Sequence, residues 1–222
     1  MKQKYDLVVL PTAVAIHETQ AEAPEVSRLY TCWCVAINIC FGLIGLCVLL
    51  LMLPLLAFCI YLDSPGPIFY VQERMGYRGR LFPMYKFRSM HVDSKRAKEI
   101  IPTVSHDPRI TRVGKLLRKT HLDELPQVLN ILRGDINLIG PRPEILEATM
   151  RLGKIIPHYW ERLYVKPGLT GWTQVKYHYG DTDEDEKIKL DYDLYYVQHR
   201  SARLDCAILV RTVREVVLGY GR

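Results

Sequence analysis

The stretch "YTCWCVAINICFGLIGLCVLLLMLPLLAFCIYL", residues 30–62, decides the architecture of this chain. It contains no charged residue, and Asn38 is its only strongly polar side chain. A helix made of these 33 residues would be about 50 Å long at ~1.5 Å per residue, whereas the hydrocarbon core of a bilayer is ~30 Å thick. The stretch therefore predicts a membrane helix that tilts steeply, bends or turns back.

Pro54 is the strongest candidate for a bend, because proline removes a helix hydrogen bond and clashes with the preceding turn. The alternative is a proline tolerated in an ordinary spanning helix. Both a re-entrant and a spanning helix remain open on these residues. We expect the segment to be retained rather than removed as a signal peptide, because residues 1–29 precede it and no small-residue cleavage site follows.

Charge and cysteine content narrow the class of protein. Residues 1–29 form a polar tail with three basic and four acidic residues, and the rest of the chain has 27 basic and 20 acidic residues. This positive excess predicts an anionic partner, and the positive-inside tendency predicts a cytoplasmic location. Five of the six cysteines lie in the apolar segment, with Cys206 outside it, which excludes a disulfide framework or a cysteine-rich zinc site.

The remaining residues, 63–222, are enough for one compact domain. Extended runs at residues 68–72 and 81–90 predict a small β-hairpin beside the membrane exit. Helical patterns dominate afterwards, so we predict a membrane-associated α+β protein that is mostly helical with a minor sheet. One predicted helix ends at Gly134 and has the apolar face Leu125, Val128, Leu129 and Leu132.

A second predicted helix near the C-terminus is amphipathic. Its apolar face consists of Cys206, Leu209, Val210, Val213, Val216 and Val217, and its basic face of Arg203, Arg211 and Arg214. This pattern suits a helix that lies on an anionic membrane surface. The commoner alternative is a helix whose apolar face is buried in the domain core.

The short stretch "HLDELPQ", residues 121–127, sets Asp123 and Glu124 side by side. The local pattern favours Asp123 as a helix N-cap, with Glu124 and Pro126 in the first turn. The wider sequence surrounds the pair with Arg112, Lys115, Arg118, Lys119, Arg133 and Arg142. Cations that bind phosphate oxygens beside paired carboxylates suit phosphoryl transfer, although a salt-bridge network would account for the same residues.

Several motifs occur in order after the membrane segment. They read "DSPGPIFYVQERMG", "YKFRSM", "HDPRITRVGKLLRKTHLDELPQVLNILRGDINLIGPRPE", "KPGLTGWTQV" and "YDLYYVQHRS". Together they closely resemble the bacterial sugar transferases of the monotopic phosphoglycosyl transferase family, from about Asp63 to the C-terminus.

The resemblance implies a specific reaction. Such enzymes transfer a hexose 1-phosphate from a UDP-sugar to undecaprenyl phosphate and release UMP, which starts the synthesis of an exopolysaccharide, capsule or O-antigen. It also implies a Mg²⁺ cofactor and a helix that enters and leaves the cytoplasmic leaflet of the bacterial inner membrane. The expected partners are the donor, the lipid acceptor and membrane lipid, without nucleic acid, and the oligomeric state stays open.

The resemblance also assigns roles to residues of this chain. Asp123 would attack the β-phosphorus and form a covalent sugar-phosphoryl aspartate, and Glu124 would act as a metal partner or base, so that both acids are candidate Mg²⁺ ligands. The residues expected to bind substrate are Lys86, Arg88, Arg118, Arg142, Lys166 and His178. Guanidinium groups suit a diphosphate because they bind its oxygens in pairs.

At two positions the sequence departs from the family pattern, which limits what the resemblance implies there. Leu53 precedes Pro54 where small relatives often carry serine, which leaves the depth of the membrane turn open. His178 stands where some relatives carry an arginine, a feature of the branch that includes initiators using UDP-glucose or UDP-galactose. The rival from another class is a non-enzymatic anchor whose basic face binds anionic lipid or nucleic acid.

Overall fold

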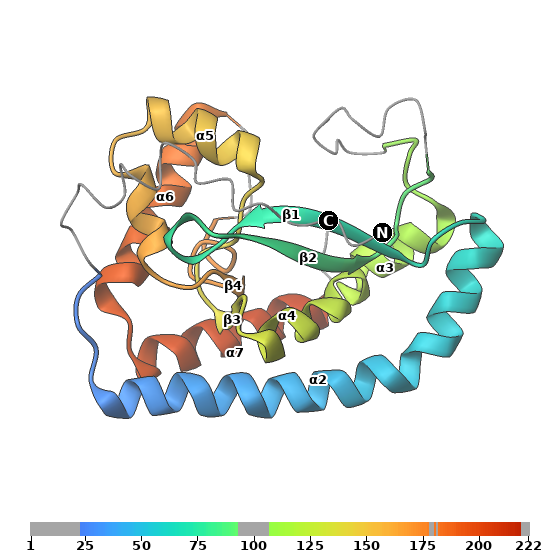
Figure 1. Ribbon diagram of the computed structural model, residues 1–222, viewed down its shortest axis with the longest axis horizontal. Coiled ribbons are helices and arrows are strands. Elements are labelled where there is room, and N and C mark those ends of the chain that lie inside the picture. The colour runs from blue at the N-terminus through green and yellow to red at the C-terminus, as the bar shows by residue number, and fades with distance from the viewer. Residues whose placement is uncertain (1–22, 93–106, 178–179, 181, 219–222) are drawn as a thin grey trace, which may run out of the picture.

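The structure is a computed structural model that describes residues 23–92, 107–177, 180 and 182–218. It is mostly helical with little sheet, as predicted from the sequence, and the described part contains two small two-stranded sheets where one hairpin was predicted. Figure 1 shows one long helix, α2, running beneath the rest of the molecule. This arrangement places the whole domain on one side of the apolar helix.

Helix α2 comprises Arg28–Asp63 and begins at Ser27, whose hydroxyl oxygen accepts a hydrogen bond from the Tyr30 backbone. Its central residues are apolar and largely exposed, since only 17% of an apolar stretch of 18 residues is buried. A helix in the core of a soluble protein would be mostly covered, so length, composition and exposure together indicate a membrane-associated helix. Figure 1 shows α2 bending toward its C-terminal end, and Pro54 inside the helix provides the physical cause.

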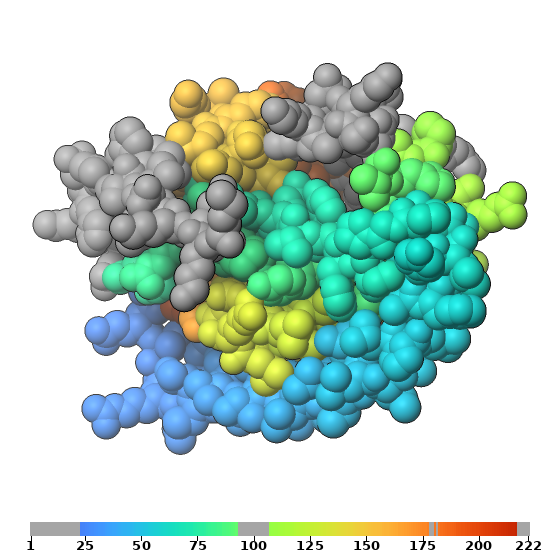
Figure 2. Space-filling view, turned by 45° about the vertical axis from the view of Figure 1, so that its right-hand side comes forward, coloured from blue at the N-terminus to red at the C-terminus, as the bar shows by residue number. Residues whose placement is uncertain are grey.

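Two glycines let another helix approach α2 closely. A Cβ atom added at Gly42 would lie 2.6 Å from Leu132 Cδ2, and one added at Gly45 would lie 2.5 Å from Val128 Cγ1. Both partners belong to α4, Val128–Arg133. Figure 2 shows α2, in blue and cyan, curving around the edge of the molecule beside the yellow-green segment of the chain that includes α4.

Asn38, the polar residue of the apolar segment, forms hydrogen bonds with the domain. Its side-chain oxygen accepts a hydrogen bond of 2.8 Å from the backbone of Leu138, and its amide donates to Asn137 Oδ1 at 2.9 Å. Both partners lie in β3, Asn137–Ile139. An otherwise costly polar group is therefore satisfied, and it fixes α2 against the sheet.

Both ends of α2 are also bound to the domain. At the start, Trp33 Nε1 donates to Asp205 Oδ2 at 3.2 Å, and the Tyr30 hydroxyl lies 3.4 Å from that of Tyr196. At the end, the buried Arg88 guanidinium donates to the backbone carbonyls of Ser64 and Ile60. The helix therefore contacts one domain from its first turn to its last.

The hairpin predicted near the membrane exit is confirmed. Strands β1, Phe69–Met75, and β2, Leu81–Phe87, pair antiparallel around the short helical turn η1, Tyr77–Gly79. The register pairs Tyr70 with Lys86, so these two side chains lie on the same face of the hairpin. Residues 72 and 74 of β1 share this face because side chains alternate along a strand.

The segment after the hairpin contains three short helical elements. Helix α3, Arg112–Lys119, leads into the 3₁₀ helix η2, Leu122–Gln127, and α4 follows directly. The predicted stop at Gly134 is confirmed, because this glycine ends α4 with φ 78°. The N-cap interpretation of Asp123 is wrong, because His121 occupies that position with φ 56° and Asp123 lies inside η2.

The rest of the domain packs around β3 and β4, Gly168–Thr170, which pair in parallel and which sequence patterns did not predict. Helix α5, Leu146–Ile155, and η3, Tyr159–Tyr164, connect these two strands. Helix α6, Asp183–His199, begins at Thr182 with a capping box, so most of the acidic run 181–186 lies in its first turn.

The last helix, α7, comprises Ala202–Leu218. Asp205 and Ile208 are its buried residues, whereas Val210 is 71% and Val213 is 62% exposed. The alternative of an apolar face buried in the core is therefore wrong for the described residues of this stripe, most of which face outward. An exposed apolar stripe flanked by arginines is the pattern of an interfacial helix.

Candidate active site

The two adjacent acids are held by a rigid segment. His121 adopts a left-handed conformation that turns the chain after α3, and its carbonyl accepts a hydrogen bond of 3.1 Å from the Glu124 backbone. Pro126 and Gln127 are buried, and the following Val128 packs against Gly45 of α2. The position of Asp123 and Glu124 is thereby tied to the membrane helix.

One carboxylate oxygen of Glu124 is bound by two cations. Its Oε1 atom accepts a hydrogen bond from Lys86 Nζ at 2.7 Å and another from Arg142 Nη2 at 2.7 Å. Burial alone would raise the pKa of Glu124, but the positive charges of Arg142 and Lys86 outweigh it and hold that pKa well below its usual range. Glu124 is therefore ionised at neutral pH and joins the hairpin to the turn that carries Arg142.

Asp123 is the opposite case. It is 9% exposed, and within the described residues its carboxylate has no hydrogen bond or ion pair. Burial, followed by the charge of Glu124, raises the pKa of Asp123, while Lys86 and Arg118 oppose this rise. A buried carboxylate without a fixed partner is available to react or to bind a ligand.

The structure brings three of the predicted substrate residues to the acids and places two others elsewhere, and the sixth lies outside the described residues. Lys86, Arg118 and Arg142 surround the acids, and Arg118 is held by a hydrogen bond of 2.9 Å from its Nε to Ser89 Oγ. Arg88 is 5% exposed and binds carbonyls at the end of α2 instead. The Lys166 amine lies beside Gly134 at the end of α4, and His178 lies outside the described residues.

Sequence reasoning missed Arg74 and Arg162, which contact the turn that carries Arg142. Arg74 Nη1 donates to the Pro143 carbonyl at 3.3 Å, and Arg162 Nη2 donates to the Arg142 carbonyl at 2.9 Å. Strand alternation could have identified Arg74, because it lies on the Lys86 face of the hairpin. No local pattern distinguishes Arg162, since two of its partners, Arg142 and Asp193, are 20 and 31 residues away in the sequence.

The acids offer few ligands to a metal on their own. Among the described residues there is no group of three or more His, Cys, Asp or Glu side chains that could hold an ion. Lys86 and Arg142 both bind Oε1 of Glu124, which leaves Glu124 Oε2 and the carboxylate of Asp123 as donors without a cation partner among the described residues. Mg²⁺ is usually bound by one or two carboxylates together with substrate phosphates, so these residues fit an ion that a diphosphate helps to hold.

Comparison with known proteins identifies the family. The model of the bacterial sugar transferase family matches residues 29–219. The chain belongs to this family. The match includes α2 as well as the segment that carries Asp123 and Glu124, so the family relationship extends to the membrane helix.

Three similar proteins illustrate the relationship. The chain is 42% identical over 165 residues to a UDP-N-acetylgalactosamine-undecaprenyl-phosphate N-acetylgalactosaminephosphotransferase of Aeromonas hydrophila, covering 74% of this chain and 39% of that protein. It is 44% identical over 160 residues to a UDP-glucose:undecaprenyl-phosphate glucose-1-phosphate transferase of Xanthomonas campestris pv. campestris, covering 71% and 33%. It is 40% identical over 194 residues to the exopolysaccharide production protein PSS of Rhizobium leguminosarum bv. phaseoli, covering 84% and 96%.

The chain thus spans less than two fifths of the length of the first two relatives and nearly all of the third. Those first two relatives are named as transferases.

Proposed function

We propose that this protein transfers a hexose 1-phosphate from a UDP-sugar to undecaprenyl phosphate and thereby starts a lipid-linked glycan. The observation that carries the proposal is the contrast between the two acids: Glu124 is bound by two cations, whereas Asp123 is buried without a partner. The names of the similar proteins support the donor and acceptor classes.

The reaction proceeds in two displacements. A carboxylate oxygen of Asp123 attacks the phosphorus attached to the sugar, the bond from this phosphorus to the bridging oxygen breaks, and UMP leaves with the bond's electrons. An oxygen of the lipid phosphate then attacks the same phosphorus and displaces the Asp123 carboxylate. One site can therefore serve a water-soluble donor and a lipid acceptor in turn, which gives ping-pong kinetics.

The cations around Asp123 bind and orient the diphosphate. Arg118 and Arg142 present planar groups suited to phosphate oxygens, and Lys86 adds a point charge. Asp123 and Glu124 would hold Mg²⁺ together with the substrate phosphates, and the ion would supply positive charge that stabilises UMP as a leaving group. Because Glu124 is committed to Lys86 and Arg142, we assign it the orientation of these cations rather than a proton transfer.

We further propose that α2 enters and leaves the same leaflet. Its first turn binds Tyr196 and Asp205, and its last turn binds Arg88, although all three belong to one domain. A helix that crossed the bilayer would separate its two ends by the ~30 Å hydrocarbon core. The bend in Figure 1 and the exposed apolar stripe of α7 support the same arrangement, with the basic domain on the cytoplasmic face of the inner membrane.

Transfer assays test the reaction and the donor together. Purified protein is incubated with undecaprenyl phosphate, Mg²⁺ and separate UDP-sugars, among them UDP-glucose, UDP-galactose and UDP-N-acetylgalactosamine, and UMP is measured. We expect UMP release with one donor and its loss in Asp123→Asn. With donor alone, mass spectrometry should find a hexose phosphate on Asp123.

Two outcomes would contradict the proposal. Sugar transfer by Asp123→Ala would exclude the covalent aspartate. A non-enzymatic anchor would be favoured if no donor gave UMP, if the affinity for anionic lipid fell as the salt concentration rose, and if Asp123→Asn left this affinity unchanged.

Topology needs a separate test. A cysteine introduced at Leu10 is treated in intact cells with a membrane-impermeant thiol reagent, and the labelling is compared with that of the parent protein. A re-entrant helix keeps residue 10 in the cytoplasm and protects the cysteine. Labelling in intact cells would instead establish a spanning helix.

A further inference from the structure

The turn that carries Arg142 is bound at each of its four carbonyls. The Pro141 carbonyl accepts from Gly168 N at 2.9 Å, and the Glu144 carbonyl accepts from Met75 N at 2.8 Å. Between them, the Arg142 carbonyl accepts from an arginine side chain at 2.9 Å, and the Pro143 carbonyl from another at 3.3 Å. Two prolines also fix φ within the turn, so its backbone has little freedom to move.

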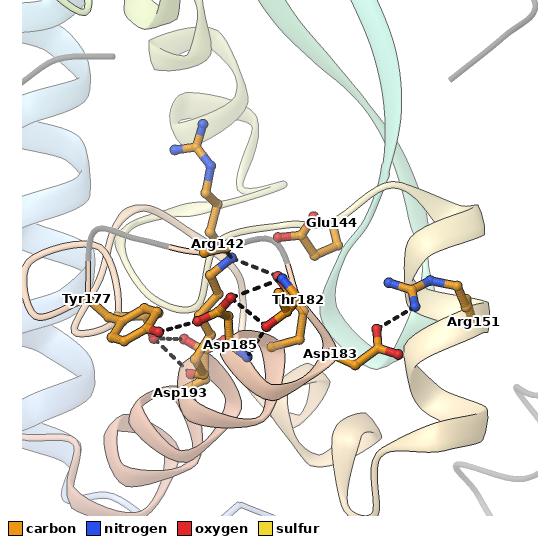
Figure 3. A network of polar contacts seen from close by, with 12 residues as sticks. Arg142, Glu144, Arg151, Tyr177, Thr182, Asp183, Asp185 and Asp193 are labelled. Carbon is orange, nitrogen blue, oxygen red and sulfur yellow. Dashed lines mark hydrogen bonds and ion pairs between the residues drawn. The ribbon is translucent and has the colours of Figure 1, made fainter. Parts of the chain in front are cut away.

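The first of these arginines, Arg162, is buried at 8% exposure and shares its guanidinium among three acceptors. Besides the Arg142 carbonyl it binds Asp193 Oδ2 at 2.7 Å and the Tyr159 hydroxyl at 2.6 Å. Asp193 in turn accepts a hydrogen bond of 2.5 Å from Thr173. Figure 3 shows Asp193 in this network, with the Arg142 side chain directed away from it.

The second arginine, Arg74, approaches the turn from β1. Its Nη1 donates to the Pro143 carbonyl and lies 3.9 Å from Glu144 Oε2, and its Nη2 donates to Gln72 Oε1 at 2.8 Å. Its Nε is buried without a partner among the described residues, so the guanidinium is held in place by its two terminal nitrogens.

Burying the Arg162–Asp193 pair is expensive in solvation, and such pairs often contribute nothing net to stability. A geometric role is a better explanation of the pair than stability. The planar guanidinium of Arg162 binds a carbonyl, a carboxylate and a hydroxyl in fixed directions, and a lysine amine cannot reproduce this geometry. The carbonyl that Arg162 binds belongs to Arg142, whose side chain binds Glu124 at 2.7 Å.

We propose that Arg162 and Arg74 are positioning residues that hold Arg142 on Glu124 by binding the carbonyls of Arg142 and Pro143. Neither arginine contacts the reacting atoms in this scheme. The inference deepens the proposed function and rests on it for its catalytic consequence, but its structural consequence can be measured without any activity.

The catalytic test uses Arg162→Lys and Arg74→Lys, which keep the charge and remove the forked geometry. We expect kcat/KM for the UDP-sugar to fall by about 10–10²-fold in each, because a displacement of about 1 Å at a charged group has effects of this size. The acid limb of the pH profile should move to higher pH, since withdrawing the Arg142 charge raises the pKa of both neighbouring acids. Arg151→Lys is the matched control, because Arg151 forms a surface ion pair of 2.6 Å with Asp183, also visible in Figure 3, and should remain within about twofold.

The independent test measures the coupling between Arg142 and Glu124. Thermal unfolding midpoints of the parent, Arg142→Gln, Glu124→Gln and the double variant give this coupling, and the cycle is repeated in the Arg162→Lys and Arg74→Lys backgrounds. We expect it to fall by at least half in each background and to stay unchanged in Arg151→Lys.

The two tests separate the two proposals. Undiminished coupling in both lysine backgrounds overturns the positioning role, whatever the activity. Lost coupling in a protein that shows no UMP release in its parent form would retain the positioning role and reject the proposed reaction. If Arg162→Lys does not fold, Arg74→Lys decides the result, because Arg74 is less buried and lies on the hairpin.

Discussion

Replacing Glu124 with glutamine should destabilise the protein, whereas replacing Asp123 with asparagine should not, although the residues are adjacent and both changes are nearly isosteric. The pKa of Glu124 is lowered in the folded protein, so its charge stabilises the fold above the unfolded-state pKa, and this stabilisation is lost as the pH falls. The pKa of Asp123 is raised, so its contribution is favourable at low pH and is lost as the pH rises through the folded-state value.

The magnitude for Glu124→Gln follows from its two hydrogen bonds. Each is charge-assisted at 2.7 Å, and such bonds contribute ~1.5–3 kcal/mol. The Arg142 side chain is 45% exposed, so solvent recovers part of the loss, and the glutamine oxygen still accepts from one cation. We therefore expect a loss of about 2–3 kcal/mol at pH 7, which lowers the midpoint of a domain this size by about 4–12 °C.

The assay is thermal unfolding of detergent-purified protein at pH 7, followed by tryptophan fluorescence for the parent and both variants. Asp123→Asn should unfold no lower than the parent, because it removes a buried charge that has no partner in the described structure. The reasoning is refuted if Asp123→Asn lowers the midpoint as much as Glu124→Gln does. An unchanged midpoint in Glu124→Gln would likewise show that the two cations do not depend on this acid.

Three further predictions concern α2 and the pH profile. Gly45→Val places its side chain against Val128, forces α4 away from α2 at a cost of about 1–3 kcal/mol, and should lower UMP release while the protein stays in the membrane fraction. Asn38→Leu leaves a buried backbone N–H unpaired and should destabilise the detergent-purified protein by about 1–3 kcal/mol in thermal unfolding, although leucine suits the bilayer better. Activity should rise with pH through the raised pKa of Asp123, and in residual-activity profiles of Glu124→Gln this acid limb should lie at lower pH because a neighbouring negative charge is gone.

Exposed positions of α2 give the controls for the first two of these variants. Ile44→Val and Ile39→Leu change residues that are 57% and 52% exposed, and both should behave like the parent. Full activity in Gly45→Val would mean that the spacing of α2 and α4 does not set the active site. Unchanged stability in Asn38→Leu would mean that α2 is only an anchor, and an acid limb in the ordinary range of an aspartate would contradict the burial of Asp123.

Local patterns were sufficient to predict several elements. The uncharged run 30–62 predicts α2, because a segment of this length and hydrophobicity cannot be accommodated in a small soluble core. Alternating residues on either side of an Arg-Gly turn predict the hairpin, and Gly134 predicts the end of α4 because glycine adopts the left-handed conformation at little cost.

Contacts between distant residues could not be predicted in this way. The short parallel pairing of β3 with β4 joins Asn137 to Gly168, and a strand of three residues has no periodicity to detect. Asp123 has a good N-cap sequence, yet His121 is the N-cap and η2 starts at Leu122, two residues earlier than a cap at Asp123 would give, because His121 turns the chain. Arg88 lies in a motif that suggests phosphate binding, but its guanidinium binds the carbonyls at the end of α2.

The membrane helix does more than retain the protein at the bilayer. A lipid acceptor leaves the membrane at a cost of ~0.8 kcal/mol for each exposed CH₂, so the reacting carboxylate must be held at a fixed height near the headgroups. Gly45 receives Val128 directly, and Val128 follows the 3₁₀ turn that carries Asp123. Val128, which contacts α2, therefore follows the proposed nucleophile by only five positions, and any displacement of α2 in the membrane would displace Asp123 with it.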